Sequence, residues 1–148
     1  MRRPEATLDD VTPIAALTEE PLIIVAPADS PYDSVTDLVE DQANRGQGVS
    51  IAGGSAGGAD HILAGLLLQD AGSDPDRHNN LPYTGGGESL AALLGGKVDA
   101  GISGVAEYAT QVQDGQLKAL GVSGAEASDL LPDVPTLTEQ GVDVTLTN

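Results

Sequence analysis

The stretch VSIAGGSAGGADHILAGLLLQDAG, residues 49–72, decides the expected fold. It starts with a short apolar run, Val49 to Ala52, which is typical of a buried strand, and it passes directly into the glycine-rich segment 53–58. Leucine and isoleucine then recur at helical spacing from Ile62 to Leu67, until Ala71-Gly72 ends the pattern. Strand, glycine loop and helix in this order form one unit of an α/β fold.

The same unit follows twice more along the chain. The second has a strand at 81–84, glycines at 85–87 and a helix at 88–94, and the third has a strand at 98–102, Ser103-Gly104 and a helix at 105–112. Three such units predict parallel strands with right-handed crossover helices, so that all glycine loops open at one edge of the sheet. We therefore expect a three-layer, doubly wound α/β fold with a mostly parallel sheet.

The flanking segments complete one lobe. Leu22 to Ala26 is a continuous apolar run between two prolines, which is typical of a fully buried strand. Ser34 and Asp37 have the spacing of a capping box at the start of a short helix. Further along we expect a strand at 117–122, a rigid turn at 131–136, a short helix at 137–140 and a last strand at 142–146. Residues 1–20 are expected to form an arm, a remnant of another lobe or a hinge, and residues 21–148 the α/β lobe.

Composition excludes several classes of partner. The 148 residues suit one domain, and the formal net charge of -17, from 23 acidic and 6 basic residues, repels nucleic acid and anionic membranes. There is no cysteine for disulfide or thiolate chemistry. The start, Met1-Arg2-Arg3-Pro4, lacks the apolar run of a signal peptide, and no stretch approaches the roughly 18 to 20 apolar residues of a membrane span.

The glycine loops are the predicted binding site. In an open parallel sheet, ligands bind beyond the carboxyl ends of the strands, where helix N-termini present free N–H groups. Glycines let the backbone approach a ligand, and the hydroxyls of Ser55, Thr84 and Ser103 add uncharged donors. This arrangement favours a small carboxylate. A nucleotide is disfavoured, because the P-loop Gly-Lys-Ser/Thr is absent and Tyr83-Thr84 stands where a dinucleotide fold carries an acidic residue.

An enzyme is the second hypothesis, since Gly53-Gly54-Ser55-Ala56-Gly57 matches the Gly-x-Ser-x-Gly nucleophile pattern and His61 lies beside Asp60. A single match in a glycine-dense loop is weak, so we expect His61 to anchor its helix instead. No residue spacing predicts a zinc or calcium site, and no cofactor is expected. Glu88 and Glu107 fall in the first turn of their helices, where they favour the helix dipole; facing a cleft, they would accept from a ligand hydroxyl or amine, or repel the wrong anion.

At these loops the chain resembles the Bug-type periplasmic solute-binding proteins, the receptors of tripartite tricarboxylate transporters. The resemblance runs from about Thr12 to the end of the chain. It rests on segments 12–15 (TPIA), 55–61 (SAGGADH), 85–88 (GGGE), 95–100 (GGKVDA), 115–120 (GQLKAL) and 133–141 (DVPTLTEQG).

The resemblance implies two α/β lobes of the type II periplasmic binding protein kind that close on a small organic acid without catalysis. It implies a periplasmic or other extracytoplasmic location and membrane transporter subunits as partners. Cleft roles carry over to Ser55, Ala56, Gly57, Gly58, Thr84, Gly85, Gly86, Gly87, Ser103, Gly104 and Glu107.

Family members also have an export signal, a first lobe before the position of Thr12 and a return to that lobe beyond Asn148. We therefore expect this chain to correspond to the second lobe alone, with the first lobe as its natural partner. Half of a cleft lacks the partner amides and the exclusion of water that closure provides, so weak or undetectable carboxylate binding is expected. A fragment without binding activity is the third hypothesis.

Overall fold

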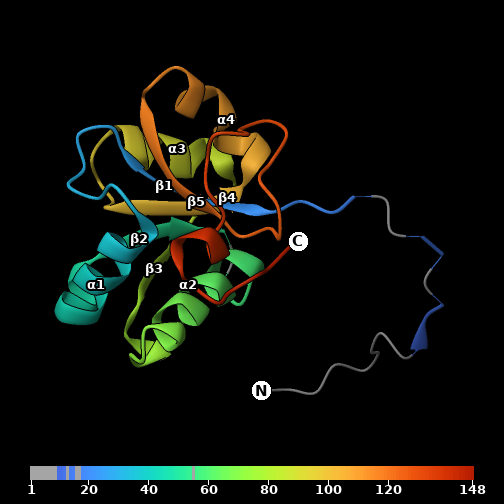
Figure 1. The fold of residues 1–148 in the computed structure, drawn as a ribbon, viewed down its shortest axis with the longest axis horizontal. Helices are drawn as coiled ribbons and strands as arrows, with labels where there is room; N and C mark the ends of the chain where they lie inside the picture. The colour runs from blue at the N-terminus through green and yellow to red at the C-terminus, as the bar shows by residue number, and fades with distance from the viewer. Residues whose placement is uncertain (1–9, 13, 16–17, 55) are drawn as a thin grey trace.

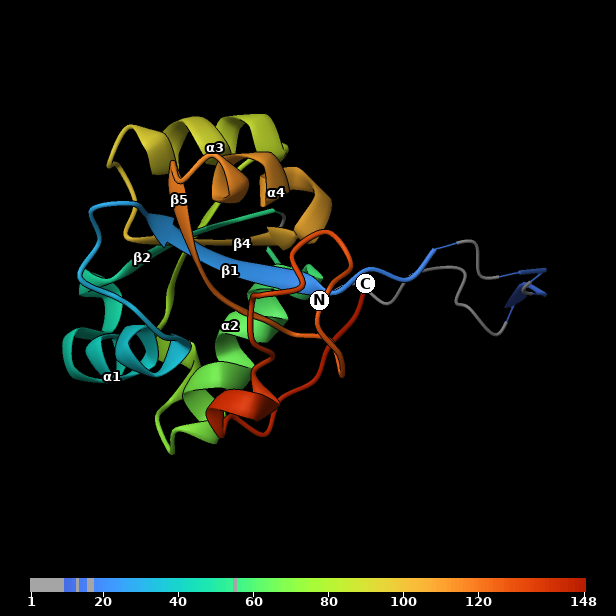
Figure 2. The ribbon, with the colours of Figure 1, turned by 45° about the horizontal axis from the view of Figure 1, so that its top comes forward.

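The computed structural model describes residues 10–12, 14–15, 18–54 and 56–148. A five-stranded sheet lies between two layers of helices (Figure 1, Figure 2). With η denoting 3₁₀ helices, the elements in chain order are β1 (Leu22–Pro27), α1 (Val35–Arg45), η2 (Gly46–Gly48), β2 (Ser50–Gly53), α2 (Ala59–Asp70), η3 (Pro75–Arg77), β3 (Asn79–Pro82), α3 (Gly86–Leu94), β4 (Ala100–Gly104), α4 (Val105–Gln113), β5 (Leu117–Val122) and η4 (Thr138–Gln140).

The sheet has the strand order β3-β2-β4-β1-β5. Strand β2 pairs in parallel with β3 and β4, which are the three strands of the glycine-loop units. Strand β1 is antiparallel to both of its neighbours, β4 and β5, so four strands share one direction and β1 opposes them. The mostly parallel, three-layer α/β fold is thus confirmed. The reversed strand in the middle of the sheet was not predicted, because a continuous apolar run indicates burial on both faces but carries no direction.

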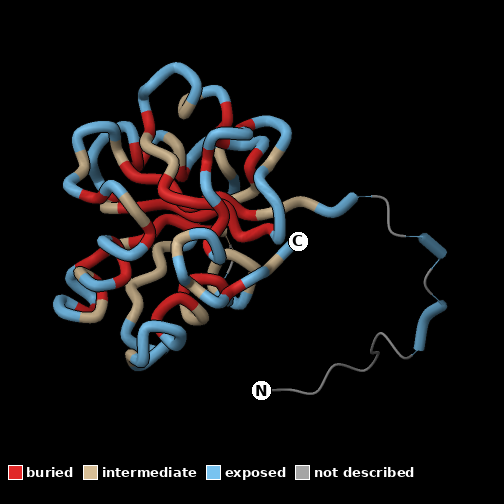
Figure 3. The backbone as a smooth tube through the Cα atoms, in the orientation of Figure 1, coloured by how far each residue is buried: buried red, intermediate tan, exposed pale blue. Residues whose placement is uncertain are grey.

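The core is divided by the sheet, and β1 supplies both halves. Leu22, Ile24 and Ala26 point to the helix layer of α1 and α2, whereas Ile23 and Val25 point to the layer of α3 and α4. This alternation follows from the two-residue period of a strand. Figure 3 shows the resulting band of buried residues through the centre of the lobe.

The start of α1 confirms the predicted capping box. The Ser34 hydroxyl accepts a hydrogen bond from the Asp37 N–H at 3.1 Å, and the Asp37 carboxylate accepts from the Ser34 N–H at 2.9 Å. The N–H of Asp33 donates to the same carboxylate, and these donors hold the pKa of the Asp37 carboxyl below its usual value. Local sequence therefore sets where this helix begins.

The predicted last strand at 142–146 is wrong. This segment joins no ladder: the N–H of Leu146 donates to the Ser123 carbonyl at 2.9 Å, and Thr147 forms an isolated bridge with Pro21. Next to it, Glu20 and Asn148 exchange two backbone hydrogen bonds of 3.0 and 2.9 Å. The chain thus enters and leaves the lobe at the same place (Figure 2). Among the described residues, no helix has the length and apolar character needed to cross a membrane.

Candidate functional site

The carboxyl ends of β2, β3 and β4 meet at one edge of the sheet and enclose a cleft of about 630 Å³. A smaller hollow of about 310 Å³ adjoins it, and Gly54, Ser103 and Glu107 line both. The cleft itself is lined by Gly53, Gly54, Ala56, Pro82, Tyr83, Thr84, Gly85, Gly86, Ser89, Ser103 and Glu107. Parallel strands carry their following loops to a common edge, which explains why three separate segments converge here.

Most of the predicted site residues lie at this edge. Ala56, Thr84, Gly85, Gly86, Ser103 and Glu107 line the cleft, and Gly58 and Gly104 line the adjoining hollow. Gly57 and Gly87 line neither, although they belong to the same loops. Ser55 lies outside the described residues.

The N-terminus of α3 offers free hydrogen-bond donors to the cleft. Within the described residues, the N–H groups of Gly85, Gly86 and Gly87 have no partner, whereas those of Glu88 and Ser89 turn back to the Gly85 carbonyl. Unpaired N–H groups at a helix start carry partial positive charge, so they attract an anion. Gly85 and Gly86 line the cleft, whereas Gly87 does not.

A buried pair fixes the position of this helix start. The Ser89 hydroxyl donates to the Gly86 carbonyl at 3.0 Å and lies 2.7 Å from the Tyr108 hydroxyl on α4. Burial raises the pKa of the Tyr108 phenol to about 12. Sequence reasoning missed both residues, because their contact joins two helices that are adjacent only in the folded lobe.

Glu88 closes the loop before α3. The Thr84 hydroxyl donates to the Glu88 carboxylate at 2.7 Å and the Thr84 N–H donates at 3.3 Å, and these two donors lower the pKa of the Glu88 carboxyl. The residue thus has the structural role of a first-turn carboxylate. It holds the Thr84 hydroxyl toward itself and does not line the cleft.

Two side chains of α2 accept hydrogen bonds from the loop between β2 and α2. The Asp60 carboxylate accepts a hydrogen bond from the Gly54 N–H, and the His61 Nδ1 accepts from the Gly57 N–H at 2.7 Å. A side chain at Gly53 would collide with Asp60, since an ideal Cβ there would lie 2.1 Å from the Asp60 Oδ2. His61 therefore anchors its helix, as expected, and its Nδ1 is engaged with the backbone.

Two carboxylates lie at the start of α4. Glu107 accepts from the Ser103 hydroxyl, and Glu20 accepts from the Ala106 N–H at 2.8 Å. Both carboxylates occupy space that a neighbouring glycine leaves open. A Cβ on Gly86 would lie 2.5 Å from the Glu107 Cδ, and one on Gly104 would lie 2.5 Å from the Glu20 Oε2. Sequence reasoning missed Glu20 because its place at this edge depends on the reversed direction of β1.

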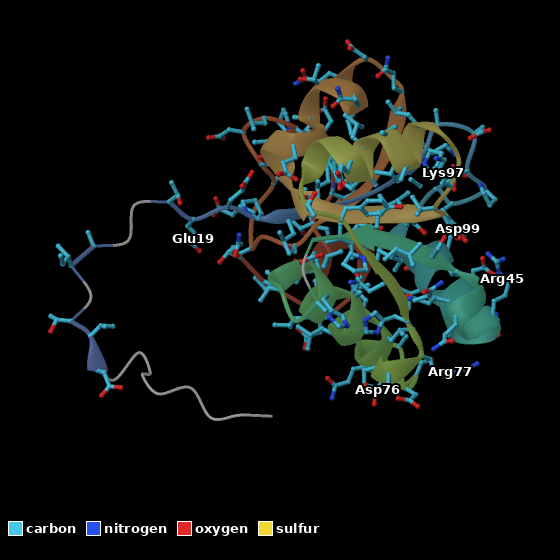
Figure 4. All side chains as sticks on the ribbon, turned by 180° about the vertical axis from the view of Figure 1, so that it is seen from behind. Glu19, Arg45, Asp76, Arg77, Lys97 and Asp99 are labelled. Atoms are coloured by element: carbon cyan, nitrogen blue, oxygen red, sulfur yellow. The ribbon has the colours of Figure 1, made fainter. Side chains whose placement is uncertain are left out.

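Charge is unevenly divided between the two edges of the sheet. The site edge carries the carboxylates of Glu20, Asp60, Glu88 and Glu107. Every Lys and Arg of the described residues lies before or at the start of a strand, toward the opposite edge. Figure 4 labels Arg45, Arg77 and Lys97 there, and Lys118 pairs with Ala26 near the end of the antiparallel β1. Within the described part of the chain, no group of three or more His, Asp or Glu side chains is arranged to hold a metal ion.

A mixed sheet with helices on both faces and a glycine-lined cleft at the strand ends is typical of an open α/β ligand-binding domain. Solved structures of solute-binding proteins contain a lobe with this fold. Comparison with known proteins identifies the protein family. Residues 3–147 match the model of the tripartite tricarboxylate transporter family receptor, and the chain belongs to this family.

Known relatives agree with this assignment. Protein BugT of Bordetella pertussis is 30% identical over 138 residues, which cover 93% of this chain and 41% of BugT. A TctC solute binding protein from Polaromonas is 28% identical with a TM-score of 0.79, covering 95% of this chain and 47% of that protein. MatC from Rhodopseudomonas palustris, solved with bound malate, is 26% identical with a TM-score of 0.80, covering 93% and 46%.

The chain spans about two fifths of the length of the curated relatives that it matches. The matching family is a receptor family, and the solved relatives are named as a solute binding protein from Polaromonas and the periplasmic binding protein BugD. The hydrolase hypothesis finds no support in them.

Proposed function

We propose that this chain is the ligand-binding lobe of a receptor that captures a small di- or tricarboxylate for a tripartite transporter. In this proposal residues 21–148 form the lobe, and residues 1–20 are the arm that leads to another lobe. The receptor works in the periplasm and delivers its ligand to the membrane subunits of the transporter. The malate bound to MatC supports the class of ligand.

The observation that carries this proposal is the unpaired donor set at the start of α3, where Gly85 and Gly86 line the cleft. The N–H groups of Gly85, Gly86 and Gly87 have no partner among the described residues, and they start a helix of nine residues. A carboxylate at this position would receive hydrogen bonds and the favourable end of the helix dipole without requiring a cation. Ser103 lines the same cleft, and its hydroxyl donates to the Glu107 carboxylate.

The test is an NMR titration of the ¹⁵N-labelled chain with succinate, malate and citrate, beside phosphate and a nucleotide, at fixed ionic strength. NMR detects the weak binding that a single lobe is expected to show. We expect a carboxylate to shift the amide resonances of Gly85, Gly86 and Gly87. Gly96 and Gly115, turn glycines that end α3 and α4 at the opposite edge, serve as internal controls and should stay unchanged.

Each alternative has its own outcome. Shifts caused by phosphate or nucleotide alone would replace the carboxylate with another anion, and no shift with any compound would leave this chain without a binding activity of its own. Ser55→Ala distinguishes binding from hydrolysis, since it would weaken carboxylate binding in the first case and abolish ester turnover in the second.

A further inference from the structure

Two imidazole rings lie in contact next to the loop between β2 and α2. His61 is in the first turn of α2 and His78 directly precedes β3, and their ring centroids are 4.6 Å apart with the planes at 60° to each other. They are the only two histidines in the sequence. Neither lines the cleft or the adjoining hollow, so neither takes part in the proposed ligand site.

Hydrogen bonds fix a different tautomer in each ring. The Nδ1 of His61 accepts from the Gly57 N–H at 2.7 Å, so this nitrogen is unprotonated and the ring hydrogen is on Nε2. The Nδ1 of His78 lies 2.6 Å from the Pro75 carbonyl, which can only accept, so this nitrogen carries the hydrogen. The Nε2 of His78 is buried and has no partner among the described residues.

Protonation of either ring breaks this arrangement. A proton on the His61 Nδ1 would face the Gly57 N–H, and that hydrogen bond would be lost. A proton on the His78 Nε2 would be buried without an acceptor. With both rings charged, two positive groups would repel each other across a centroid distance of 4.6 Å.

The ionisable neighbours do not offset such a charge. Loop 53–58 and β3 have no ionisable side chain, and the packed elements around the rings contribute Asp60 on α2, and Asp74, Asp76 and Arg77 at η3. The Asp60 carboxylate accepts from the Gly54 N–H, and the Arg77 guanidinium donates to the Ala43 carbonyl at 3.4 Å. The Asp74 carboxylate accepts from the Asp76 N–H. Within the described residues, none of the four charged side chains pairs with either ring.

We propose that His61, in contact with His78, is a pH-sensitive latch on the loop between β2 and α2. The neutral His61 ring holds the Gly57 N–H and keeps the loop in place, and Gly54 and Ala56 of this loop line the cleft. When the pH falls through the range in which histidine ordinarily becomes charged, the hydrogen bond to Gly57 is lost and the loop is released. The latch is independent of the proposed function, whereas its effect on carboxylate affinity rests on that function.

NMR of the ¹⁵N-labelled chain tests the latch directly. Side-chain spectra at about pH 8 distinguish the histidine tautomers, and they should show the Nε2–H form for His61 and the Nδ1–H form for His78. As the pH is lowered to about 5.5, the Gly57 amide resonance should move with the same midpoint as the His61 ring, and Gly115 at the opposite edge should stay unchanged. A His61 ring in the Nδ1–H form, or a Gly57 amide that does not follow the His61 titration, overturns the latch.

Replacing His61 with asparagine isolates the titrating group. In His61→Asn the amide oxygen takes the place of Nδ1 and accepts from the Gly57 N–H without titrating. On acidification from about pH 8 to 5.5, the equilibrium constant of unfolding, measured by urea denaturation, should rise about five- to tenfold more in the wild type than in this variant. His78→Asn keeps a donor for the Pro75 carbonyl and should retain a pH dependence through His61. Equal pH dependence of the wild type and His61→Asn, or its loss only in His78→Asn, overturns the role of His61.

The effect on ligand binding is measured by NMR titration with malate at the same two pH values. Protonation of malate affects both proteins alike, so the ratio of the wild-type dissociation constant to that of His61→Asn isolates the latch. We expect this ratio to rise about threefold or more on acidification, because fewer molecules then have the loop in place. An unchanged ratio overturns the effect on affinity but leaves the carboxylate site intact. Malate that shifts no α3 amide at either pH overturns the proposed function and leaves the latch intact.

Discussion

Replacing Gly53 with alanine should destabilise the lobe through the loop between β2 and α2. The new Cβ would lie 2.1 Å from the Asp60 Oδ2 and 2.8 Å from the Asn80 Oδ1, distances that require one partner to move. Asp60 would have to release the Gly54 N–H, and a hydrogen bond to a charged group contributes roughly 1.5 to 3 kcal/mol. Overpacking adds about 1 to 3 kcal/mol, although hydration of the displaced carboxylate offsets part of this. We expect a loss of roughly 2 to 4 kcal/mol.

The free energy of unfolding is measured by urea denaturation, followed by far-ultraviolet circular dichroism. Gly87→Ala is the matched control, because no atom lies within 4 Å of an added Cβ and the residue is in the first turn of α3. This control should equal the wild type or exceed it by up to about 1 kcal/mol. If Gly53→Ala unfolds within about 0.5 kcal/mol of the wild type, the contact between Asp60 and Gly54 does not fix this loop.

Three further predictions concern other parts of the lobe. Ser123→Ala removes the acceptor of the Leu22 N–H at 2.9 Å and the donor to the Leu146 carbonyl at 2.5 Å. The free energy of unfolding, measured by urea denaturation, should fall by about 1 to 3 kcal/mol. An unchanged urea midpoint would contradict this. Ser34→Ala should cost about 1 kcal/mol through the lost cap of α1, whereas Ser34→Asp should restore most of it. Burial raises the pKa of Tyr108 to about 12, above the ordinary value of 10.0, so its contribution to stability is complete below pH 10 and disappears as the pH rises through 12. The urea midpoint should therefore fall over that range, less steeply in Tyr108→Phe, and identical slopes would refute the assignment.

Local patterns predicted the order of the strand-helix units and the start of α1. Two strands are displaced by two residues: β3 spans Asn79–Pro82, and β4 spans Ala100–Gly104, so Ser103 and Gly104 end the strand and do not form a loop. In each unit the apolar strand, the loop and the helix are neighbours in sequence, and Ser34 with Asp37 forms its capping box within four residues. Their hydrogen bonds are decided by adjacent residues, so the sequence contains the required information. The convergence of the three strand ends, two of which continue into loops and one directly into α4, follows from the parallel direction of β2, β3 and β4.

Long-range partners could not be predicted in this way. The direction of β1 depends on which strands flank it, and the place of Glu20 at the site edge depends on that direction. The segment 142–146 has the residues of a strand, but its backbone reaches the neighbouring chain only through the hydrogen bond of Leu146 to Ser123, so no ladder forms. The contact of Ser89 with Tyr108 likewise requires the packing of α3 beside α4.

Residues 20 and 148 lie side by side at one end of the lobe, because Glu20 and Asn148 exchange two backbone hydrogen bonds. Because these two residues are adjacent, the lobe can be inserted into a loop of another protein without moving the two sides of that loop apart. For the same reason a short linker can join residue 148 to residue 20, with new termini placed in the exposed turn at Gly115. In such a circular permutant β2 and β4 remain unbroken, so the glycine cleft should persist although the order of the elements along the chain has changed.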